Sequence, residues 1–148
     1  KHSNLIIASA IELLLNYCTR FYDRQFITRK KENKDTLSTF EALLNDYFTS
    51  DKPQLFGTPT VAYCAEKLHL SANYFGDLIK KVTGSSAQEY ILSKIMDTAK
   101  ELLADPAKSI SDVAYALGYQ YPQYFSRAFK RIVGYSPNEY RTLRKTLL

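Results

Sequence analysis

The chain of 148 residues contains two cysteines and two histidines, and this shortage excludes several kinds of site. Cys18 and Cys64 form neither a CxxC pair nor a metal-type spacing, so we expect each to be a buried free thiol in a reducing cytosol. His2 and His69 are too few and too scattered for a metal site, and no set of residues suggests a catalytic triad. We therefore expect no metal, no cofactor and no enzymatic activity.

Long apolar runs are also missing. No segment approaches the ~20 consecutive apolar residues of a transmembrane helix. The most apolar stretch, Leu5–Leu15, is interrupted by Glu12 and has neither a basic leader nor a small-residue cleavage site, so it is not expected to be a signal peptide. A hydrophobic content of 45% predicts a globular protein, which we place in the cytoplasm without membrane contact. The first residue is Lys1, which suggests a fragment of a longer protein.

The segment Ser109–Arg141 has the pattern of two short helices joined by a tight turn and followed by a third helix. Ser109 is a candidate cap of the first helix, and Gly118 a candidate end. Pro122 suits the first turn of the second helix, which Gly134 would end. Helical spacing gives that second helix an apolar face and an opposite polar, cationic face. The apolar face consists of Phe125, Ala128, Phe129 and Ile132, and the polar face of Gln123, Arg127, Lys130 and Arg131.

This arrangement is typical of a helix-turn-helix, in which the second helix enters the major groove of DNA. The groove admits one α-helix, and its base edges offer hydrogen-bond donors and acceptors to a polar helix face. The alternative is an ordinary amphipathic helix with a solvated basic face. From this segment alone the two interpretations remain open.

An internal repeat favours the helix-turn-helix. The segment Ser71–Ile91 aligns with Tyr121–Arg141 at an offset of fifty residues, which a chance amphipathic pattern does not explain. The helix that precedes Ser71 repeats at an offset of 49, so the second unit should have one extra residue in its turn. Apolar positions pair as Phe75 with Phe125, Ile79 with Phe129 and Val82 with Ile132, and outer positions as Asn73 with Gln123, Asp77 with Arg127, Lys80 with Lys130 and Lys81 with Arg131.

From about Asp35 onward the chain resembles the paired helix-turn-helix DNA-binding region of bacterial AraC/XylS-type transcriptional regulators. The most specific part is Ser109–Arg141, with its Tyr-Phe-Ser-Arg-x-Phe-Lys and Gly-x-Ser-Pro-x-Glu-Tyr-Arg runs. The resemblance implies two subdomains joined by a helix, with both recognition helices on one side of the DNA. Two departures are His69, where the first turn often has Gly, and Gly76 with Asp77, where longer or basic residues are frequent.

We expect an all-α protein: two helix-turn-helix subdomains joined by a long helix and preceded by a long apolar helix. Residues 1–34 are assigned to the apolar helix and a basic linker, as the tail of an absent sensing or dimerisation domain. Residues 35–91 form the first subdomain, 86–104 the connecting helix and 105–148 the second subdomain. Within these, Thr28–Asp35 is predicted to be a linker that could also touch phosphates, and Thr49–Pro59 a loop.

The apolar helix, residues 1–27, must be covered by something. We expect an absent N-terminal domain or a second copy of the chain; packing on the chain's own DNA-binding region is the alternative. Net charge supports nucleic-acid binding mainly in the second subdomain, because residues 118–148 carry six Lys or Arg against one Glu, within a total of +5.

Each outer residue is given a role. Arg127 can bind guanine with its fork, Gln123 can read adenine, and Asn73 and Asp77 are the matching candidates of the first unit. A surface pair of Asp77 with a neighbouring lysine is the alternative for that residue. Phosphate contacts or contacts at the start of the recognition helix are expected for Ser71, Lys80, Lys81, Gln120, Tyr121, Lys130 and Arg131.

The predicted function is sequence-specific binding of double-stranded DNA as the output domain of a bacterial transcription regulator, with two helices in successive major-groove faces. The alternative is a protein-interaction module that uses this geometry without DNA. Besides DNA, the predicted partners are a second copy through the N-terminal helix or an absent domain, and RNA polymerase.

Overall fold

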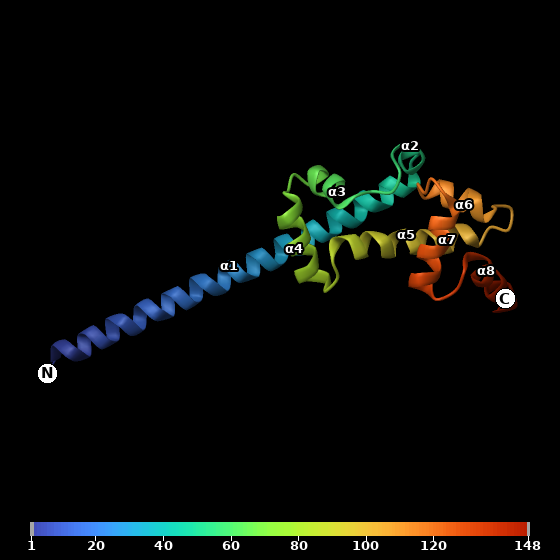
Figure 1. The fold of residues 1–148 in the computed structure, drawn as a ribbon. Helices are drawn as coiled ribbons and strands as arrows, with labels where there is room; N and C mark the ends of the chain where they lie inside the picture. The colour runs from blue at the N-terminus through green and yellow to red at the C-terminus, as the bar shows by residue number, and fades with distance from the viewer. Residues whose placement is uncertain (1, 148) are drawn as a thin grey trace. The chain divides into compact units, whose positions relative to one another are not determined.

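The computed structural model describes residues 2–147, and every regular element among them is a helix, as the all-α prediction requires. Figure 1 labels the helices and colours them in chain order, from blue at the N-terminus to red at the C-terminus. They are α1 His2–Thr49, α2 Lys52–Phe56, α3 Val61–Lys67, α4 Ala72–Thr83, α5 Ala87–Leu103, α6 Ile110–Ala116, α7 Pro122–Val133 and α8 Pro137–Leu147. The described residues divide into two units, one ending at Thr36 and the other beginning at Leu37.

The first unit is helical throughout, so the predicted linker at Thr28–Asp35 is wrong: these residues continue α1. The reason is that a polar composition does not interrupt a helix. The segment contains neither Gly nor Pro, and Lys, Arg and Glu are good helix formers. The expectation that both cysteines are buried also fails for Cys18, which lies exposed in this unit, whereas Cys64 is buried.

The apolar side chains of the first unit are all uncovered, with exposed fractions between 52% and 70%. They are Leu5, Ile6, Ile7, Ile11, Leu13, Leu14, Leu15, Tyr17, Phe21, Tyr22, Phe26 and Ile27. One 18-residue window of α1 reaches a mean hydropathy of 1.2, which by length and composition is enough to cross a membrane. The prediction concerned consecutive apolar residues, and polar residues such as Ser9, Glu12 and Asn16 interrupt the apolar runs of α1, so this window does not overturn it.

The second unit is built on a single core that begins with the last turns of α1. Phe40, Leu44 and Tyr47 are buried there, although they continue the same helix whose earlier apolar residues are exposed. The Phe40 ring meets the Phe75 ring of α4 edge-on, with centroids 4.9 Å apart, and the Tyr90 ring of α5 at 5.3 Å. The first helix-turn-helix and the connecting helix are therefore packed on the end of α1 as one body.

The two helix-turn-helix units, α3–α4 and α6–α7, have the repeat geometry that the sequence predicts. Phe75, Ile79, Phe125 and Phe129 are fully buried, and left-handed glycines end both second helices. Ile132 is the exception, since 42% of its surface is exposed. Only the last turn of α7 is affected: the neighbouring Val133 packs against the core instead.

The turns of the two units have the same hand despite their different residues. Gly118 has φ +93° and His69 has φ +58°, so the histidine adopts the left-handed conformation that glycine favours. In both turns the following amide donates to a carbonyl five residues back, from Leu70 to Ala65 at 2.9 Å and from Tyr119 to Ala114 at 3.0 Å. The departure at His69 therefore leaves the turn regular, and the second turn contains the one extra residue that the offset of the repeat predicts.

The segment predicted as a loop, Thr49–Pro59, contains a short helix. Pro53 sits in the first turn of α2, where a missing N–H is harmless, and Gly57 follows the last residue. The next helix begins later than the Thr58-Pro59 pair suggests, because the Thr60 side chain caps it by accepting a hydrogen bond from the Tyr63 amide at 3.1 Å.

The connecting helix α5 agrees with its prediction. Ser86 and Glu89 form the predicted capping box, and Asp105-Pro106 lies beyond the end of the helix. The side chains predicted to lie inward are buried except Leu102, which is half-buried; they are Ile91, Ile95, Met96, Ala99 and Leu103. The 17 residues of α5 at ~1.5 Å each span ~26 Å.

Candidate nucleic-acid interface

The outer face of α7 carries the strongest candidate site. Gln123, Arg127, Lys130 and Arg131 are all exposed, while Phe125 and Phe129 on the opposite face are fully buried. None of these four polar side chains donates to or accepts a hydrogen bond from a residue that the structure describes. The helix is therefore fixed from behind by its aromatic side chains, and its polar face is free to make new contacts.

The outer face of α4 repeats this arrangement with weaker chemistry. Asn73, Asp77, Lys80 and Lys81 are exposed, and Phe75 and Ile79 hold the helix from behind. Two lysines here oppose one aspartate, whereas three cations and no anion line the equivalent face of α7. The first helix-turn-helix, α3–α4, therefore presents a smaller positive charge to an anionic partner than the second, α6–α7.

No ion pair forms between Asp77 and either lysine among the residues that the structure describes. The surface pair that the sequence left open for Asp77 is thus not formed. The carboxylate is exposed and available as an acceptor, but its charge opposes a nearby phosphate.

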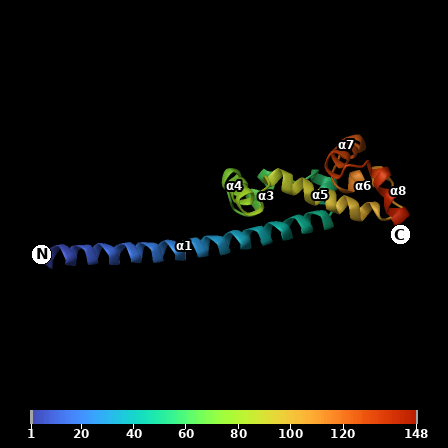
Figure 2. The same ribbon diagram turned by 90° about the horizontal axis from the view of Figure 1, so that it is seen from below.

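The connecting helix brings the two candidate faces into one body. Both α4 and α7 pack against α5. The two helices run from top to bottom of the view in Figure 1 and are both seen nearly end-on in Figure 2, so their axes are roughly parallel. Neither covers the other, since the outer residues of both are exposed. The part of the chain from Leu37 onward thereby carries two parallel helices, α4 and α7, each with a free polar face.

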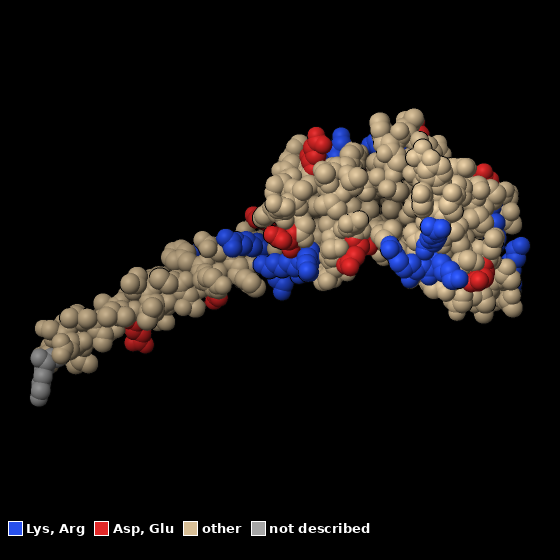
Figure 3. Space-filling model, viewed as in Figure 1, with Lys and Arg blue, Asp and Glu red and all other residues tan. Residues whose placement is uncertain are grey.

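Positive charge gathers over α7 on the face seen in Figure 3. The outer face of this helix has three exposed cations, and two of them, Lys130 and Arg131, occupy its last turn. Cations at a helix C-terminus are stabilised by the helix dipole. The outer face of α7 thus carries one more cation than that of α4, whose last turn contains Lys80 and Lys81.

The residues at the start of each recognition helix have different local roles. Ser71 caps α4, its hydroxyl accepting a hydrogen bond from the Tyr74 amide at 3.2 Å. Tyr121 precedes α7 without a capping bond, and its half-exposed ring lies edge-on to that of Tyr124 at 5.6 Å. Gln120 is exposed beside it. All three predicted residues are thus at the N-terminal ends of the two helices.

Two residues beside this site were missed from the sequence. Tyr74 and Tyr124 occupy equivalent positions next to Asn73 and Gln123, and each has 56% of its surface exposed. The repeat itself carries the signal, because an aromatic residue that recurs at an exposed position is not explained by the core. Tyr90 and Tyr140, by contrast, pack as the sequence predicts, Tyr140 edge-on to Phe129 at 5.5 Å.

Arg141 is a cation whose role is structural. Its Nε donates to the Leu103 carbonyl at 3.1 Å and its Nη2 to the Lys108 carbonyl at 2.7 Å, so it satisfies carbonyls at the end of α5 and beyond. Arg144 similarly donates to the Lys100 carbonyl at 3.2 Å. These two arginines count toward the basic C-terminal charge, yet they are engaged within the fold.

Three groups with raised pKa values, Tyr90, Tyr119 and Cys64, lie outside the outer faces of α4 and α7. Burial, aided by the hydrogen bond that Tyr90 donates to Glu41, raises the pKa of the Tyr90 phenol. Burial also raises the pKa of the Tyr119 phenol, an effect that the positive charge of Arg131 opposes. Burial raises the pKa of the Cys64 thiol to about 11, so it stays neutral and unreactive. No cluster of three or more potential metal ligands occurs among the described residues.

Comparisons with known proteins agree with this geometry. The model of a helix-turn-helix domain family matches residues 64–143, which is more than half of the chain. The Msm operon regulatory protein of Streptococcus mutans is 38% identical over 77 residues, which cover 52% of this chain and 28% of that protein. The chain spans from 11% to 33% of the length of three such curated relatives.

Solved structures match a large part of the chain. The C-terminal domain of AraT, a response regulator from Geobacillus stearothermophilus, is 30% identical, with a TM-score of 0.63 over 73% of this chain and 84% of that one. The DNA-binding domain of AdpA, solved in complex with a target DNA, is 25% identical, with a TM-score of 0.55 over 60% of this chain and 79% of that one. The latter shows a protein of this fold bound to DNA.

Proposed function

Because the chain belongs to the AraC-type helix-turn-helix family and is a DNA-binding region of a transcription regulator, we propose that α4 and α7 enter successive major-groove faces of one duplex. The observation that carries the proposal is the pair of exposed polar faces on roughly parallel helices of one body. A single chain would then cover two turns of DNA, as a helix-turn-helix dimer does.

The second helix-turn-helix, α6–α7, makes the stronger contacts to base edges. Arg127 stands at the middle of the outer face of α7, exposed and without an intramolecular partner, so its guanidinium can donate two parallel hydrogen bonds to guanine. Gln123, one turn earlier, can donate to and accept from adenine in the same manner. Tyr124 lies beside it and can contact a thymine methyl group or the sugar.

The first helix-turn-helix, α3–α4, contacts bases with shorter side chains. Asn73 corresponds to Gln123 and is assigned to adenine, and Asp77 can accept a hydrogen bond from the amino group of cytosine. Asp77 gives no attraction to phosphate, so this unit contributes specificity with less affinity. We therefore expect the second half-site to be bound more tightly than the first.

The remaining residues position the protein on the backbone. Lys80 and Lys81 lie in the last turn of α4, as Lys130 and Arg131 do in α7, and we assign all four to phosphates. Ser71, Gln120 and Tyr121 are assigned to the backbone at the opposite ends of the two helices. Such contacts fix the register of the helices and do not read sequence directly.

Selection of binding sites from random duplex DNA with the 148-residue chain tests the proposal. We expect a site with two conserved half-sites centred about 10–10.5 base pairs apart, since that is one turn of B-DNA. The half-site bound by α7 should be the more constrained. Recovery of a single half-site, or of no sequence at all, would contradict insertion of both helices.

For the exposed apolar residues of α1, we propose that protein covers them. Ser9, Glu12, Asn16 and Asp23 recur at helical spacing and give the helix one polar stripe, which a lipid-surrounded helix would leave in hydrocarbon. A second copy or an adjoining domain of the regulator would bury the apolar remainder. This assignment keeps the protein in the cytoplasm, where RNA polymerase is a further proposed partner.

Sedimentation equilibrium of the chain tests the self-association. We expect a concentration-dependent dimer that is lost when Ile11 and Leu14 are both replaced by Ser. The matched control replaces the polar Ser9 and Asn16 by Ala, which should leave the dimer intact. A monomer at high concentration, with the helix retained by circular dichroism, would exclude self-association through α1.

A further inference from the structure

The segment between α1 and α3, residues 50–60, makes an unusually close backbone contact with the turn of the second helix-turn-helix. We call this segment the strap. A Cβ atom at Gly118 would lie 2.6 Å from the carbonyl carbon of Gly57 and 2.8 Å from the amide nitrogen of Thr58. Real Cβ atoms do not approach backbone this closely, so the contact exists only because residue 118 has no side chain.

The strap is itself fixed to the first half of the body. The buried side chain of Tyr47, at the end of α1, donates a hydrogen bond from its hydroxyl to the Gly57 carbonyl at 2.6 Å. The Gly57 amide in turn donates to the Pro53 carbonyl at 2.9 Å, and Pro53 is buried. Tyr47 also meets Tyr63 of α3 edge-on, with ring centroids 5.4 Å apart. Gly57 is thus tied to the elements that carry the first recognition helix.

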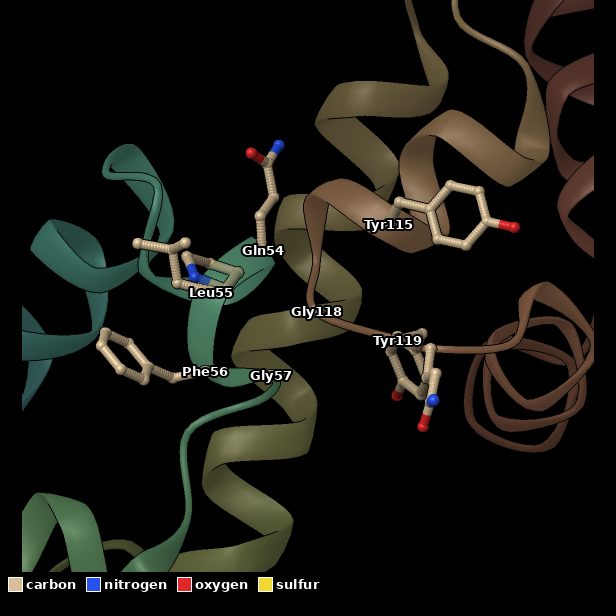
Figure 4. A pocket seen from close by; sticks show the side chains of 9 residues that line it. Gln54, Leu55, Phe56, Gly57, Tyr115, Gly118 and Tyr119 are labelled. Carbon is tan, nitrogen blue, oxygen red and sulfur yellow. The ribbon is translucent and has the colours of Figure 1, made fainter.

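The side chains of the strap do not make this contact. Figure 4 shows Gln54, Leu55 and Phe56 pointing away from Gly118. Leu55 and Phe56 have 66% and 76% of their surfaces exposed. An open groove of about 510 Å³ lies between the strap and the turn. The junction is therefore backbone against backbone, and a change of the exposed Leu55 or Phe56 side chain would leave it in place.

We propose that the strap is a clamp that sets the distance and rotational phase between the two DNA-reading helices. This inference rests on the proposed function, in which α4 and α7 read one duplex together. The connecting helix α5 joins the two units along one line. The contact between Gly57 and Gly118 adds a second attachment away from that line and removes the bending freedom that one helix would leave. Gly118 is accordingly a positioning residue for specificity, although it does not touch DNA.

The chain contains a matched pair of variants for the test. Gly118 and Gly134 both have φ +93°, so Ala at either position adopts a left-handed backbone that disfavours a side chain. A Cβ at Gly134 would meet nothing within 4 Å, whereas one at Gly118 would collide with the strap. Any difference between Gly118→Ala and Gly134→Ala therefore reports the clamp and not the left-handed turn. Tyr47→Phe, which removes only the hydrogen bond to Gly57, serves as a milder variant should Gly118→Ala fail to fold.

The first measurement is binding to a series of duplexes derived from the selected site. In these the two half-sites are moved apart or together by one and two base pairs, and a further duplex keeps only the half-site of α7. We expect Gly118→Ala to weaken binding at the natural spacing about tenfold, to flatten the dependence on spacing, and to change single half-site binding less than twofold. Gly134→Ala should keep the spacing dependence of the natural chain. Equal profiles for the two variants would overturn the clamp.

The second measurement needs no DNA. Residual dipolar couplings of α4 and α7 in the free chain should fit one alignment tensor in the natural protein and in Gly134→Ala, and two in Gly118→Ala. A shift in the same direction is expected for Tyr47→Phe. If a single tensor persists in both clamp variants, the clamp is refuted. If the tensors separate but the natural chain shows no need for two half-sites, the proposed function fails and the clamp stands.

Discussion

The two helix-turn-helix units have equivalent buried faces, with Ile79 in the place of Phe129, and different outward ones. Phe75 and Phe125 are buried at equivalent positions, and left-handed residues occupy both turns, yet a carboxylate at Asp77 replaces the guanidinium of Arg127. The difference teaches that the core fixes the geometry of the unit, while the outer face is under no packing constraint. Duplication therefore preserves the helix positions and lets the two halves differ in what they read.

The helices that follow the two recognition helices diverge for a physical reason as well. Ile91, in α5, is buried in the core, whereas its counterpart Arg141 reaches back to carbonyls at and beyond the end of α5. An apolar residue therefore suits the position of Ile91. The second unit lies at the end of the body, where carbonyls at the end of α5 need a donor.

The largest expected effect tests the equality of the inward faces. Phe75→Ala and Phe125→Ala should each lower the free energy of unfolding by about 3–5 kcal/mol, since both rings are fully buried. Urea unfolding followed by circular dichroism measures this loss. The exposed neighbours give the controls: Tyr74→Ala and Tyr124→Ala should each change stability by about 0.5 kcal/mol or less. A loss below about 1 kcal/mol at either phenylalanine would break the comparison.

The next effect tests the difference between the outward faces. Arg127→Ala should cost about 1–3 kcal/mol of binding to the selected site and relax the preference at one base pair. Asp77→Ala should relax one base pair of the other half-site while strengthening binding to random DNA, because a negative charge is removed. Fluorescence anisotropy with specific and random duplexes measures both. Equal losses of Arg127→Ala on the two kinds of DNA would contradict a base-reading role.

A smaller effect asks whether both units touch phosphate. Lys130→Ala and Lys80→Ala should each reduce the steepness of the fall of log K for DNA binding with log salt by about one unit, because one counterion fewer is released on binding. Binding titrations between low and physiological salt give the slope. An unchanged slope for Lys80→Ala alone would show that the first unit does not hold the backbone, and would make the comparison between the units sharper.

The smallest effect concerns the turns. His69→Gly should stabilise the fold by on the order of 0.5–1 kcal/mol. The reason is that the left-handed conformation costs histidine more free energy than glycine loses in conformational entropy on folding. Gly84→Ala is the reverse change at φ +79°, in open space, and should destabilise by a similar amount. Thermal unfolding compares the two. Destabilisation by His69→Gly would mean that packing of the imidazole stabilises the fold by more than its left-handed backbone costs.

Much of the interface was predictable because repetition and periodicity are local properties. The spacing of Phe125 and Phe129 places Arg127 outward without knowledge of the fold, and the structure finds each predicted outer residue exposed. Ile132 failed because the last turn of a helix can leave its core, which periodicity does not reveal. The linker at Thr28–Asp35 failed because polar residues are compatible with both coil and helix.

The sequence by itself determined the two amphipathic pairs, their caps and the polar character of their outer faces, since all of these depend on neighbours within one or two turns of the same helix. Only the tertiary structure decided that Arg141 serves α5 and that Gly118 lies against the backbone of Gly57. Both contacts join residues tens of positions apart. A glycine that ends a helix and a glycine that admits another backbone are identical in sequence, and only the packing around Gly118 distinguishes them.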